Sequence, residues 1–362
     1  MMLIGISSYY GEANFKDMEK QAEDLRVFNA NKELTELGSR RGFEFFKECK
    51  KSGIEIENYN KENHSRYDLI IFWDIPNLIN LFKIKFRNII FQTKTILIIE
   101  DTPVARSRNL LMIPFLFKKI ILNTIDSNYK FRNYKTSTFT LPTLPSVNEI
   151  KEMKSFISNS KRKKKINYIA SNKLALNKNS SFLFRERIVK DLNLYESKIF
   201  DLYGNGWEKR QIPMDMPLIF LIVRNKYIKK LVLKLLNIFR YSTKTNGTVK
   251  LKSETLNQYD FSLAIEPFLG SPKIVLEKLF DPMLAGSIPI YYGPEINSIP
   301  KDCYLRIKKR VALKKISFYV NKISEEKKEI YRRNIYQFLI SKAADKYRYK
   351  TFAKFLINEI VS

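Results

Sequence analysis

The fold is decided by residues 259–307, which read YDFSLAIEPFLGSPKIVLEKLFDPMLAGSIPIYYGPEINSIPKDCYLRI. An apolar run over 260–265 predicts a buried strand that delivers Glu266 to its carboxyl end. A helix is predicted over 274–285, and a second apolar strand follows at 288–292. A strand, a helix and another strand in this order indicate a parallel crossover unit.

The start of the predicted helix is a candidate anion site. Glu277 and Lys278 lie there, after a Gly-Ser-Pro loop at 270–272. Backbone N–H groups and the positive end of a helix dipole favour a bound anion, and Lys278 adds a full charge. An ordinary solvated ion pair is the plainer interpretation of the same two residues.

The same alternation of strands and helices extends through the rest of the chain. We predict strands at 2–6, 68–73, 95–99, 120–123, 166–170 and 199–203, and helices at 12–51, 181–194 and 324–361. Buried strands separated by helices are typical of parallel sheets, so the fold class is α/β. A polar and basic stretch near the middle divides the chain into two such halves, which places a ligand site at the carboxyl ends of the strands.

Composition narrows the chemistry. The chain has 362 residues, with Lys+Arg 65 against Asp+Glu 37 and a net charge of +28, which predicts an anionic partner such as a nucleic acid, a membrane surface or a phosphorylated substrate. One His and two Cys argue against a His-based triad, a Cys/His zinc site and a disulfide framework. With only eleven glycines, the chain is expected to have few glycine-rich loops that bind phosphate.

Membrane-spanning segments are not predicted. The longest uncharged apolar runs, at 110–117 and 216–223, are far shorter than the roughly 20 residues that a transmembrane helix needs. We expect a cytoplasmic protein, either free or peripheral on the inner face of the cytoplasmic membrane.

Three elements at fixed spacing carry a family resemblance. The chain has AIEP at 264–267, VLEKL at 275–279, GSIPI at 286–290 and then Gly293. Together they resemble the C-terminal motif of the α-1,3/1,4-fucosyltransferases, glycosyltransferase family 10, in which a strand ending in Phe-Glu-Asn precedes Val-Thr-Glu-Lys and Gly-x-x-Pro. The chain departs from the motif at Pro267, where the family has Asn, and at Ile274, where it has Tyr. With these departures the resemblance still implies a sugar-nucleotide transferase, but it leaves the donor sugar open.

A second segment supports the resemblance. YIASN at 168–172, RERIVKDL at 185–192 and FDLYG at 200–204 are similar to a further run of family residues. In that match Arg185 takes the place of the arginine that contacts the donor diphosphate, and a guanidinium suits this role because it forks onto two phosphate oxygens. The alternative is an arginine on a solvated helix face.

A third segment supplies a candidate base. LIIEDTP at 97–103 is similar to the family's Glu-x-Pro, whose Glu is proposed as the catalytic base. We assign the role to Glu100, which ends a strongly apolar run. Asp101 is the rival carboxylate, because one residue rather than two separates it from Pro103.

The resemblance implies a GT-B-like fold of two Rossmann-like domains facing a central cleft, with a helical C-terminal tail. The domains expected are an N-terminal acceptor-side domain at 1–150, a basic linker at 151–165, a donor-binding domain at 166–322 with an insert at 214–241, and C-terminal helices at 323–362. It also implies inverting transfer from a GDP-sugar, usually GDP-fucose, without a required metal or other cofactor.

The implied roles follow the motif positions. Glu100 would take the acceptor proton, while Arg185 and Lys278 would stabilise the departing GDP. Glu277 would hold ribose or sugar hydroxyls, and Glu266 would support the pocket or contact the sugar. The acceptor would be a glycan hydroxyl of lipopolysaccharide, a glycolipid or a surface polysaccharide.

The insert at 214–241 has its own pattern. Ile228, Leu231, Val232, Leu235 and Phe239 recur on one helical face, and no acidic residue lies between Lys226 and Arg240. The pattern resembles an interfacial helix on anionic lipid. A core helix with a basic outer face fits it equally.

Two further readings of the whole chain remain open. A nucleic-acid-binding protein would explain the charge, but no nucleic-acid-binding motif is present, so no nucleic acid is expected as a partner. A relative that has lost catalysis and only binds glycans would explain Pro267 and Ile274.

Overall fold

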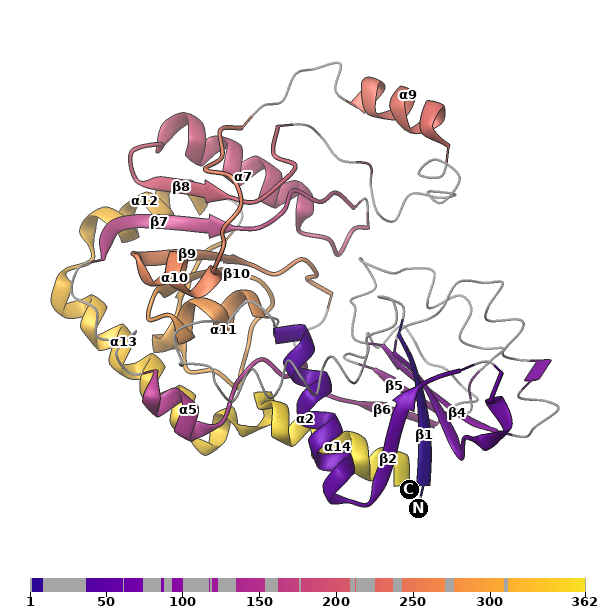
Figure 1. Cartoon of the computed structure of the whole chain (residues 1–362). Helices are drawn as coiled ribbons and strands as arrows, with labels where there is room; N and C mark the ends of the chain where they lie inside the picture. Colours follow the sequence, from indigo (N-terminus) through magenta and orange to yellow (C-terminus); the bar gives the residue numbers. More distant parts are fainter. Residues whose placement is uncertain are drawn as a thin grey trace. The chain divides into compact units, whose positions relative to one another are not determined.

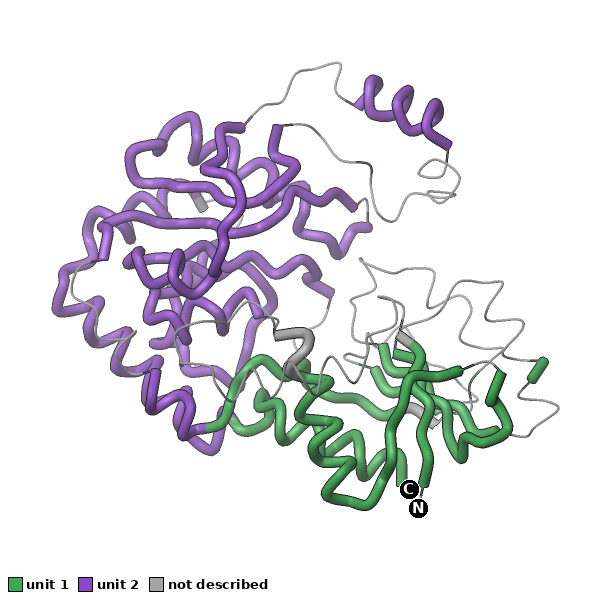
Figure 2. Tube along the Cα trace, in the orientation of Figure 1, with its two compact units in different colours: residues 1–29, 36–146, 345–362 green, residues 30–35, 147–344 purple. Residues whose placement is uncertain are grey.

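A computed structural model describes residues 2–8, 37–60, 62–73, 86–87, 93–99, 117, 119–122, 135–153, 162–175, 177–208, 212, 225–236, 243–270, 277–308 and 312–361. These residues form two compact units, which Figure 2 distinguishes by colour. Unit 1 contains residues 1–29, 36–146 and 345–362, and unit 2 contains 30–35 and 147–344. The described helices include none that is long and apolar enough to cross a bilayer.

Unit 1 contains a parallel sheet in the order β2-β1-β3-β4-β5-β6. Its described elements are β1 (Met2–Ser8), α2 (Leu37–Lys51), β2 (Ile54–Asn58), a 3-10 turn (His64–Arg66), β3 (Leu69–Trp73), β4 (Lys94–Ile99), β5 (Lys119–Leu122), β6 (Lys135–Thr138) and α14 (Tyr349–Val361). The central strands β3, β4 and β5 are almost wholly buried, as the apolar runs predict.

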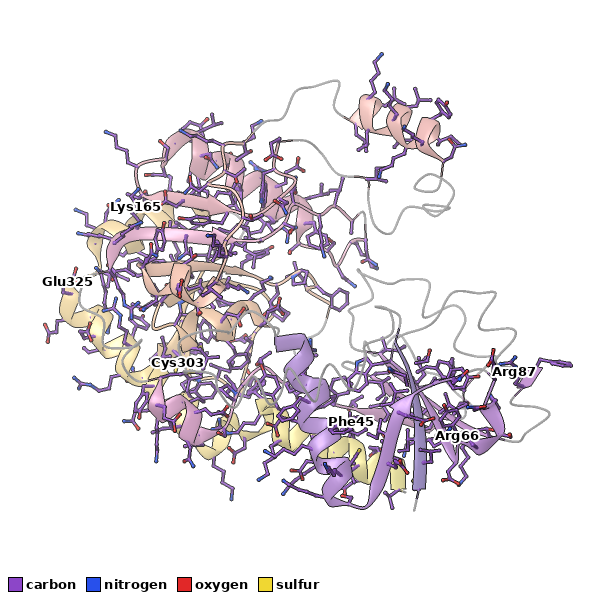
Figure 3. All side chains as sticks on the ribbon, in the orientation of Figure 1. Phe45, Arg66, Arg87, Lys165, Cys303 and Glu325 are labelled. Carbon is purple, nitrogen blue, oxygen red and sulfur yellow. The ribbon has the colours of Figure 1, made fainter. Side chains whose placement is uncertain are left out.

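The last helix of the chain packs in unit 1. Phe352 of α14 contacts Phe139 with ring centroids 4.7 Å apart, and it meets Trp73 at 6.3 Å. Trp73 in turn packs edge-on against Phe45 of α2, which is fully buried and is labelled in Figure 3. Lys119 of β5 pairs with Glu359 at 3.0 Å. The predicted C-terminal helices are therefore shared, since residues 345–362 lie in unit 1 and the preceding helix lies in unit 2.

Unit 2 contains a second parallel sheet in the order β11-β10-β9-β7-β8 (Figure 1). Its described elements are α5 (Val147–Glu152), β7 (Lys163–Ile169), α7 (Phe182–Tyr195), β8 (Phe200–Tyr203), α9 (Lys226–Leu236), α10 (Lys252–Asn257), β9 (Tyr259–Ile265), α11 (Glu277–Leu284), β10 (Ile288–Tyr292), a 3-10 turn (Lys301–Cys303), β11 (Leu305–Arg306), α12 (Ala312–Lys322), α13 (Glu325–Ile340) and, reaching into unit 1, a 3-10 turn (Lys342–Tyr347).

The unit 2 sheet has an apolar core on one face. Apolar residues of α7 and α12 pack there on Phe261, Leu263 and Ile265 of β9 and on Ile288 and Ile290 of β10. This is the core that the deciding stretch predicts. The predicted parallel α/β organisation is confirmed in both units, whereas the central cleft between them stays a prediction.

A buried ionic cluster connects α13 to β9. Asp260 accepts from Lys328 Nζ and from Arg332 Nη2, each at 2.5 Å, and all three side chains are almost completely buried. Arg332 also donates to the Gly286 carbonyl at 3.2 Å, just beyond the carboxyl end of α11. Because helix ends leave unpaired carbonyls that carry partial negative charge, this cation also stabilises α11.

The basic stretch before β7 is only partly solvated. Arg162 is half-buried and donates to the carbonyls of Asn257 and Ala285, at the ends of α10 and α11. Burial, and then the nearby charge of Arg332, lower the pKa of Arg162 to about 10. Residues 154–161 of the predicted linker lie outside the described residues.

We expect Asp260→Ala to lower the free energy of unfolding by about 3–5 kcal/mol, because it leaves Lys328 and Arg332 buried without their shared counterion. Urea unfolding would measure this change. The matched control is Glu325→Gln, whose carboxylate also pairs with Lys328 but is 76% exposed, so that its loss should cost at most about 1 kcal/mol. Equal effects of the two substitutions would contradict the structural role given to Asp260.

Candidate active site

The predicted donor-site residues of unit 2 lie at one edge of its sheet. The carboxyl ends of parallel strands meet at the same edge, which is where α/β proteins bind ligands. Glu266 directly follows β9, Glu277 and Lys278 begin α11, and Arg185 lies in the first turn of α7, after β7.

The loop after β9 is fixed to the start of α7. Ser181 donates its backbone N–H to the Pro267 carbonyl at 3.0 Å and its hydroxyl to the Glu266 carbonyl. Leu269 donates to the Asn179 carbonyl at 2.7 Å. These bonds tie the loop that carries Glu266 to the helix that carries Arg185.

Pro267 fits this arrangement. A residue with an N–H at this position would meet the Ser181 carbonyl in the short antiparallel ladder. That carbonyl already accepts from the Arg185 N–H, at 2.8 Å, as the first helical bond of α7. Proline therefore ends the ladder without leaving an acceptor unpaired.

Gly293 allows close packing around Glu266. A Cβ at Gly293 would lie 2.1 Å from the Tyr291 hydroxyl oxygen and 2.9 Å from Glu266 Cγ. Both neighbouring side chains are fully buried and have little room to move. The glycine of the predicted motif is thus required by the position of Glu266, which forms part of the interior beneath the loop.

We expect Gly293→Ala to weaken donor binding by about tenfold or more, because it displaces Glu266 and Tyr291 and shifts of about 1 Å are enough to disturb a site. Isothermal titration with GDP would measure the loss. Gly53→Ala is a control for strain away from the site: its φ of +68° strains alanine, but a Cβ there meets no neighbour and Gly53 lies in unit 1, so donor affinity should be unchanged. Unchanged GDP affinity in Gly293→Ala would contradict the packing argument.

Glu277 and Lys278 form an ion pair at the start of α11, with Oε1 and Nζ 3.0 Å apart. Both side chains are partly exposed and therefore accessible to a ligand. Burial alone would raise the pKa of Glu277, but the charges of Lys278 and Lys252 outweigh it and lower that pKa to about 2. The attraction of Glu277 raises the pKa of Lys278. Both groups are therefore charged at neutral pH.

The lowered pKa of Glu277 also makes the stability of the fold depend on pH. Because the pKa of Glu277 is lower in the folded chain than its ordinary value of 4.5, its contribution to stability is complete above pH 4.5 and is lost as the pH falls towards about 2.

A second ion pair supports the first and was not predicted. Lys252 of α10 pairs with Asp281, which is buried one helical turn after Glu277 on α11. Burial raises the pKa of Asp281, and Lys252 opposes that rise. The charge of Lys252 also lowers the pKa of Glu277, so this one lysine favours the ionised form of both carboxylates. No motif in the sequence distinguishes Lys252 from the other lysines and arginines, which number 65 in all.

Arg185 is buried rather than solvated. Its Nη2 donates to the carbonyls of Ser171 at 2.9 Å and Lys173 at 3.3 Å, and its guanidinium lies 4.3 Å from the ring centre of Phe182. The alternative of a solvated helix face is therefore wrong. Arg185 fixes the loop after β7.

The two predicted phosphate-binding cations both follow strands at the same edge of the unit 2 sheet. The positive charge of Arg185 lowers the pKa of Lys278, against the larger effect of Glu277. Burial raises the pKa of Tyr168, the positive charge of Arg185 lowers it, and the negative charge of Glu266 raises it. The structure thus brings Arg185, Glu266, Glu277 and Lys278 into one electrostatically connected group.

Glu100 lies outside the described residues, as do Asp101 and residues 271–276. The strand β4 ends at Ile99, directly before Glu100.

Comparison with known proteins identifies the activity. Residues 220–339, about a third of the chain, match the model described as glycosyltransferase family 10 (fucosyltransferase) C-term. This match confirms the resemblance that the motifs indicate, and the chain is a glycosyltransferase. No curated protein sequence matches the chain.

Solved structures show the fold. Anabaena HepE in complex with UDP and glucose is 11% identical, with a TM-score of 0.52, over 100% of this chain and 99% of that one. The DNA-modifying enzyme β-glucosyltransferase is 14% identical, with a TM-score of 0.52, over 99% and 100%. An α1,3-fucosyltransferase with GDP is 14% identical, with a TM-score of 0.46, over 100% and 90%. The first two confirm an α/β fold of the GT-B type with two Rossmann-like domains.

Proposed function

We propose that this chain, a glycosyltransferase with a family 10 C-terminal match, transfers L-fucose from GDP-fucose to a glycan hydroxyl with inversion. The grouping of Arg185, Glu277 and Lys278 at the carboxyl edge of the unit 2 sheet carries the proposal. The acceptor proposed is the hydroxyl of a lipopolysaccharide, a glycolipid or a surface polysaccharide. An anionic membrane surface is the further partner proposed, through the insert at 214–241.

The donor diphosphate would bind the two cations. Lys278 is partly exposed and charged at neutral pH, and Arg185 lies at the same edge of the unit 2 sheet. When the bond to the sugar breaks, negative charge grows on the leaving GDP, and fixed cations stabilise that charge without further reorganisation. This contribution requires no metal ion.

The carboxylates would orient the sugar-nucleotide. Glu277 stays ionised at neutral pH and accepts hydrogen bonds from ribose or sugar hydroxyls, which holds the anomeric carbon in position. Glu266 is fully buried, so its role in the proposal is to support the wall of the pocket.

Glu100 would act as the general base of unit 1. It would accept the proton of the acceptor hydroxyl, whose oxygen attacks the anomeric carbon from the face opposite the leaving GDP, which inverts the configuration.

A second candidate is transfer from another nucleotide sugar. Pro267 and Ile274 stand where the family motif has Asn and Tyr, so the donor contacts made by those two side chains are absent here.

Slow hydrolysis of the donor tests the proposal without knowledge of the acceptor. We expect release of GDP from GDP-fucose, and a large loss of that release in Glu277→Gln. Glu295→Gln, on the exposed surface beside Lys301, is the control. Release of the nucleotide from UDP- or CMP-sugars alone would rule out GDP-fucose as the donor and favour the second candidate, transfer from another nucleotide sugar. No release from any nucleotide sugar would favour a protein that only binds glycans.

A further inference from the structure

The helix α9 (Lys226–Leu236) exposes an apolar face. Tyr227 is 84% exposed, Leu231 and Leu235 are each 58% exposed, and none of the described residues of the helix is buried. A helix of the protein core would bury this face. The alternative of a core helix with a basic outer face is therefore not what α9 shows. Exposed apolar side chains gathered on one helix face mark an interaction site.

The charges of α9 lie opposite its apolar face. At roughly 100° per residue, Tyr227, Ile228, Leu231, Val232 and Leu235 form one side. The four lysines 226, 229, 230 and 234 lie on the other side and its margins, together with the half-buried Leu233 and Leu236, and the helix has no acidic residue. A lysine stem can lie along an apolar surface while its ammonium group reaches outward. An exposed apolar face with lysines near its margins and no acidic residue on the helix is complementary to an anionic bilayer surface.

The insert that carries α9 begins and ends near the candidate active site. Thr243 donates its backbone N–H to the Trp207 carbonyl at 3.3 Å, so the chain segments before and after the insert are joined. Trp207 is fully buried, donates its indole N–H to the Ala170 carbonyl at 2.7 Å and packs beside Arg185. The base of the insert is therefore part of the same sheet edge as the donor-site residues.

Gly204 allows the chain segments at the base of the insert to pack closely. Its φ is +121°, and a Cβ there would lie 2.1 Å from the Ala170 carbonyl oxygen. Its N–H donates to the Gly247 carbonyl at 2.8 Å, which adds the returning segment to the end of β8.

We propose that α9 binds the surface of an anionic lipid bilayer, with its apolar face among the lipid chains and its lysines at the headgroups. This inference rests on the proposed function and deepens it, because a membrane contact made by an insert whose base lies at the donor-site edge would fit an acceptor glycan carried by a membrane lipid.

Vesicle co-sedimentation with the full chain tests the proposal. We expect binding to vesicles that contain phosphatidylglycerol, weakening with added salt, and much weaker binding to phosphatidylcholine alone. Lys230→Gln/Lys234→Gln should weaken binding by about fivefold for each lysine. Leu231→Ser/Leu235→Ser should weaken it by at least tenfold, since roughly two buried side chains are lost.

Matched controls exclude a general effect of charge or surface apolarity. Lys314→Gln/Lys315→Gln removes two exposed lysines of α12, and Leu194→Ser removes a leucine of α7 that is 63% exposed. Both should bind vesicles like the unsubstituted chain. Since every substituted residue is exposed, all variants should fold, and GDP affinity should be unchanged in all of them.

Three results would overturn the proposal. The first is equal vesicle binding by the unsubstituted chain and Leu231→Ser/Leu235→Ser. The second is binding to neither vesicle type. The third is a dimer in sedimentation velocity that Leu231→Ser dissociates, because a second copy would then cover the face. Vesicle binding needs no donor, so its failure would remove the proposed membrane partner but leave the proposed sugar transfer standing, and failure of GDP binding would leave the membrane site standing.

Discussion

Lys278→Ala is expected to lower kcat/KM for sugar transfer by about 10²–10³-fold, because a fixed cation that stabilises leaving-group charge contributes on that scale. Lys278 is partly exposed, stays charged through its 3.0 Å pair with Glu277, and lies at the same sheet edge as Arg185. Glu277 keeps Lys252 as a second neighbouring cation, so the fold should survive the change. Steady-state kinetics with GDP-fucose and a glycan acceptor would measure it.

The control for Lys278 is a lysine with a similar pairing and no place in the site. Lys301 pairs with Glu295 at 3.5 Å on the exposed surface of unit 2, so Lys301→Ala should leave the kinetics unchanged. Lys278→Gln should behave like Lys278→Ala, because it keeps a polar side chain of nearly the same length but not the charge. Kinetics in Lys278→Ala equal to those of Lys301→Ala would remove Lys278 from the mechanism.

Glu100→Gln is expected to lower kcat for transfer by about 10²–10⁴-fold, the usual contribution of a general base. Glutamine keeps the shape of the side chain but does not accept a proton. Donor affinity should be unchanged, because the donor-site residues belong to unit 2. Single-turnover kinetics together with GDP titration would separate these two effects.

Asp101→Asn is the companion variant, because Asp101 is the rival carboxylate of the same segment. If Glu100 is the base, Asp101→Asn should retain transfer within a few-fold of the unsubstituted rate. The reverse pattern would move the role to Asp101, and full activity in Glu100→Gln would rule out the assignment.

The buried strands were the predictable part of the fold. β3, β4, β9 and β10 are apolar runs that require two covered faces, and each lies within one residue of its predicted bounds at either end. The edge strands β2 and β6 were not predicted. β2 alternates Ile and Glu in IEIEN, and β6 reads KTST without an apolar residue, so both are held mainly by backbone pairing with a neighbour.

The ionic connections of the fold were not predictable. Asp260 meets Lys328 and Arg332 across 68 and 72 residues of sequence. Nothing in the local pattern distinguishes these two cations from the many that remain solvated. The packing of α14 in unit 1 likewise depends on contacts such as Phe139 with Phe352, which only the folded chain brings together.

The candidate site was predicted where a motif fixes the spacing. Glu277 and Lys278 were found because a strand, a loop and a helix start recur at family distances, and Arg185 by the same means. The anchoring of Arg185 to the carbonyls of Ser171 and Lys173 was not predicted, because it depends on the path of the loop after β7.

The net charge of +28 is distributed among distinct roles. Lys328 and Arg332 are buried around Asp260, and Lys252, Arg185 and Lys278 belong to the candidate active site. The lysines of α9 form one side of an exposed helix. The composition alone allowed nucleic acid, membrane and phosphorylated ligands, and the positions of these residues favour the last two.

A thermal-shift panel with GDP, GDP-fucose, UDP-glucose and a CMP-sugar tests the central claim most directly. The claim is that the carboxyl edge of unit 2 binds a GDP-sugar through Arg185 and Lys278. We expect GDP and GDP-fucose to raise the Tm, the other nucleotides to leave it unchanged, and Lys278→Ala to abolish most of the rise while Lys301→Ala preserves it. An equal rise with GDP in Lys278→Ala, or stabilisation by UDP- or CMP-sugars alone, would contradict the account.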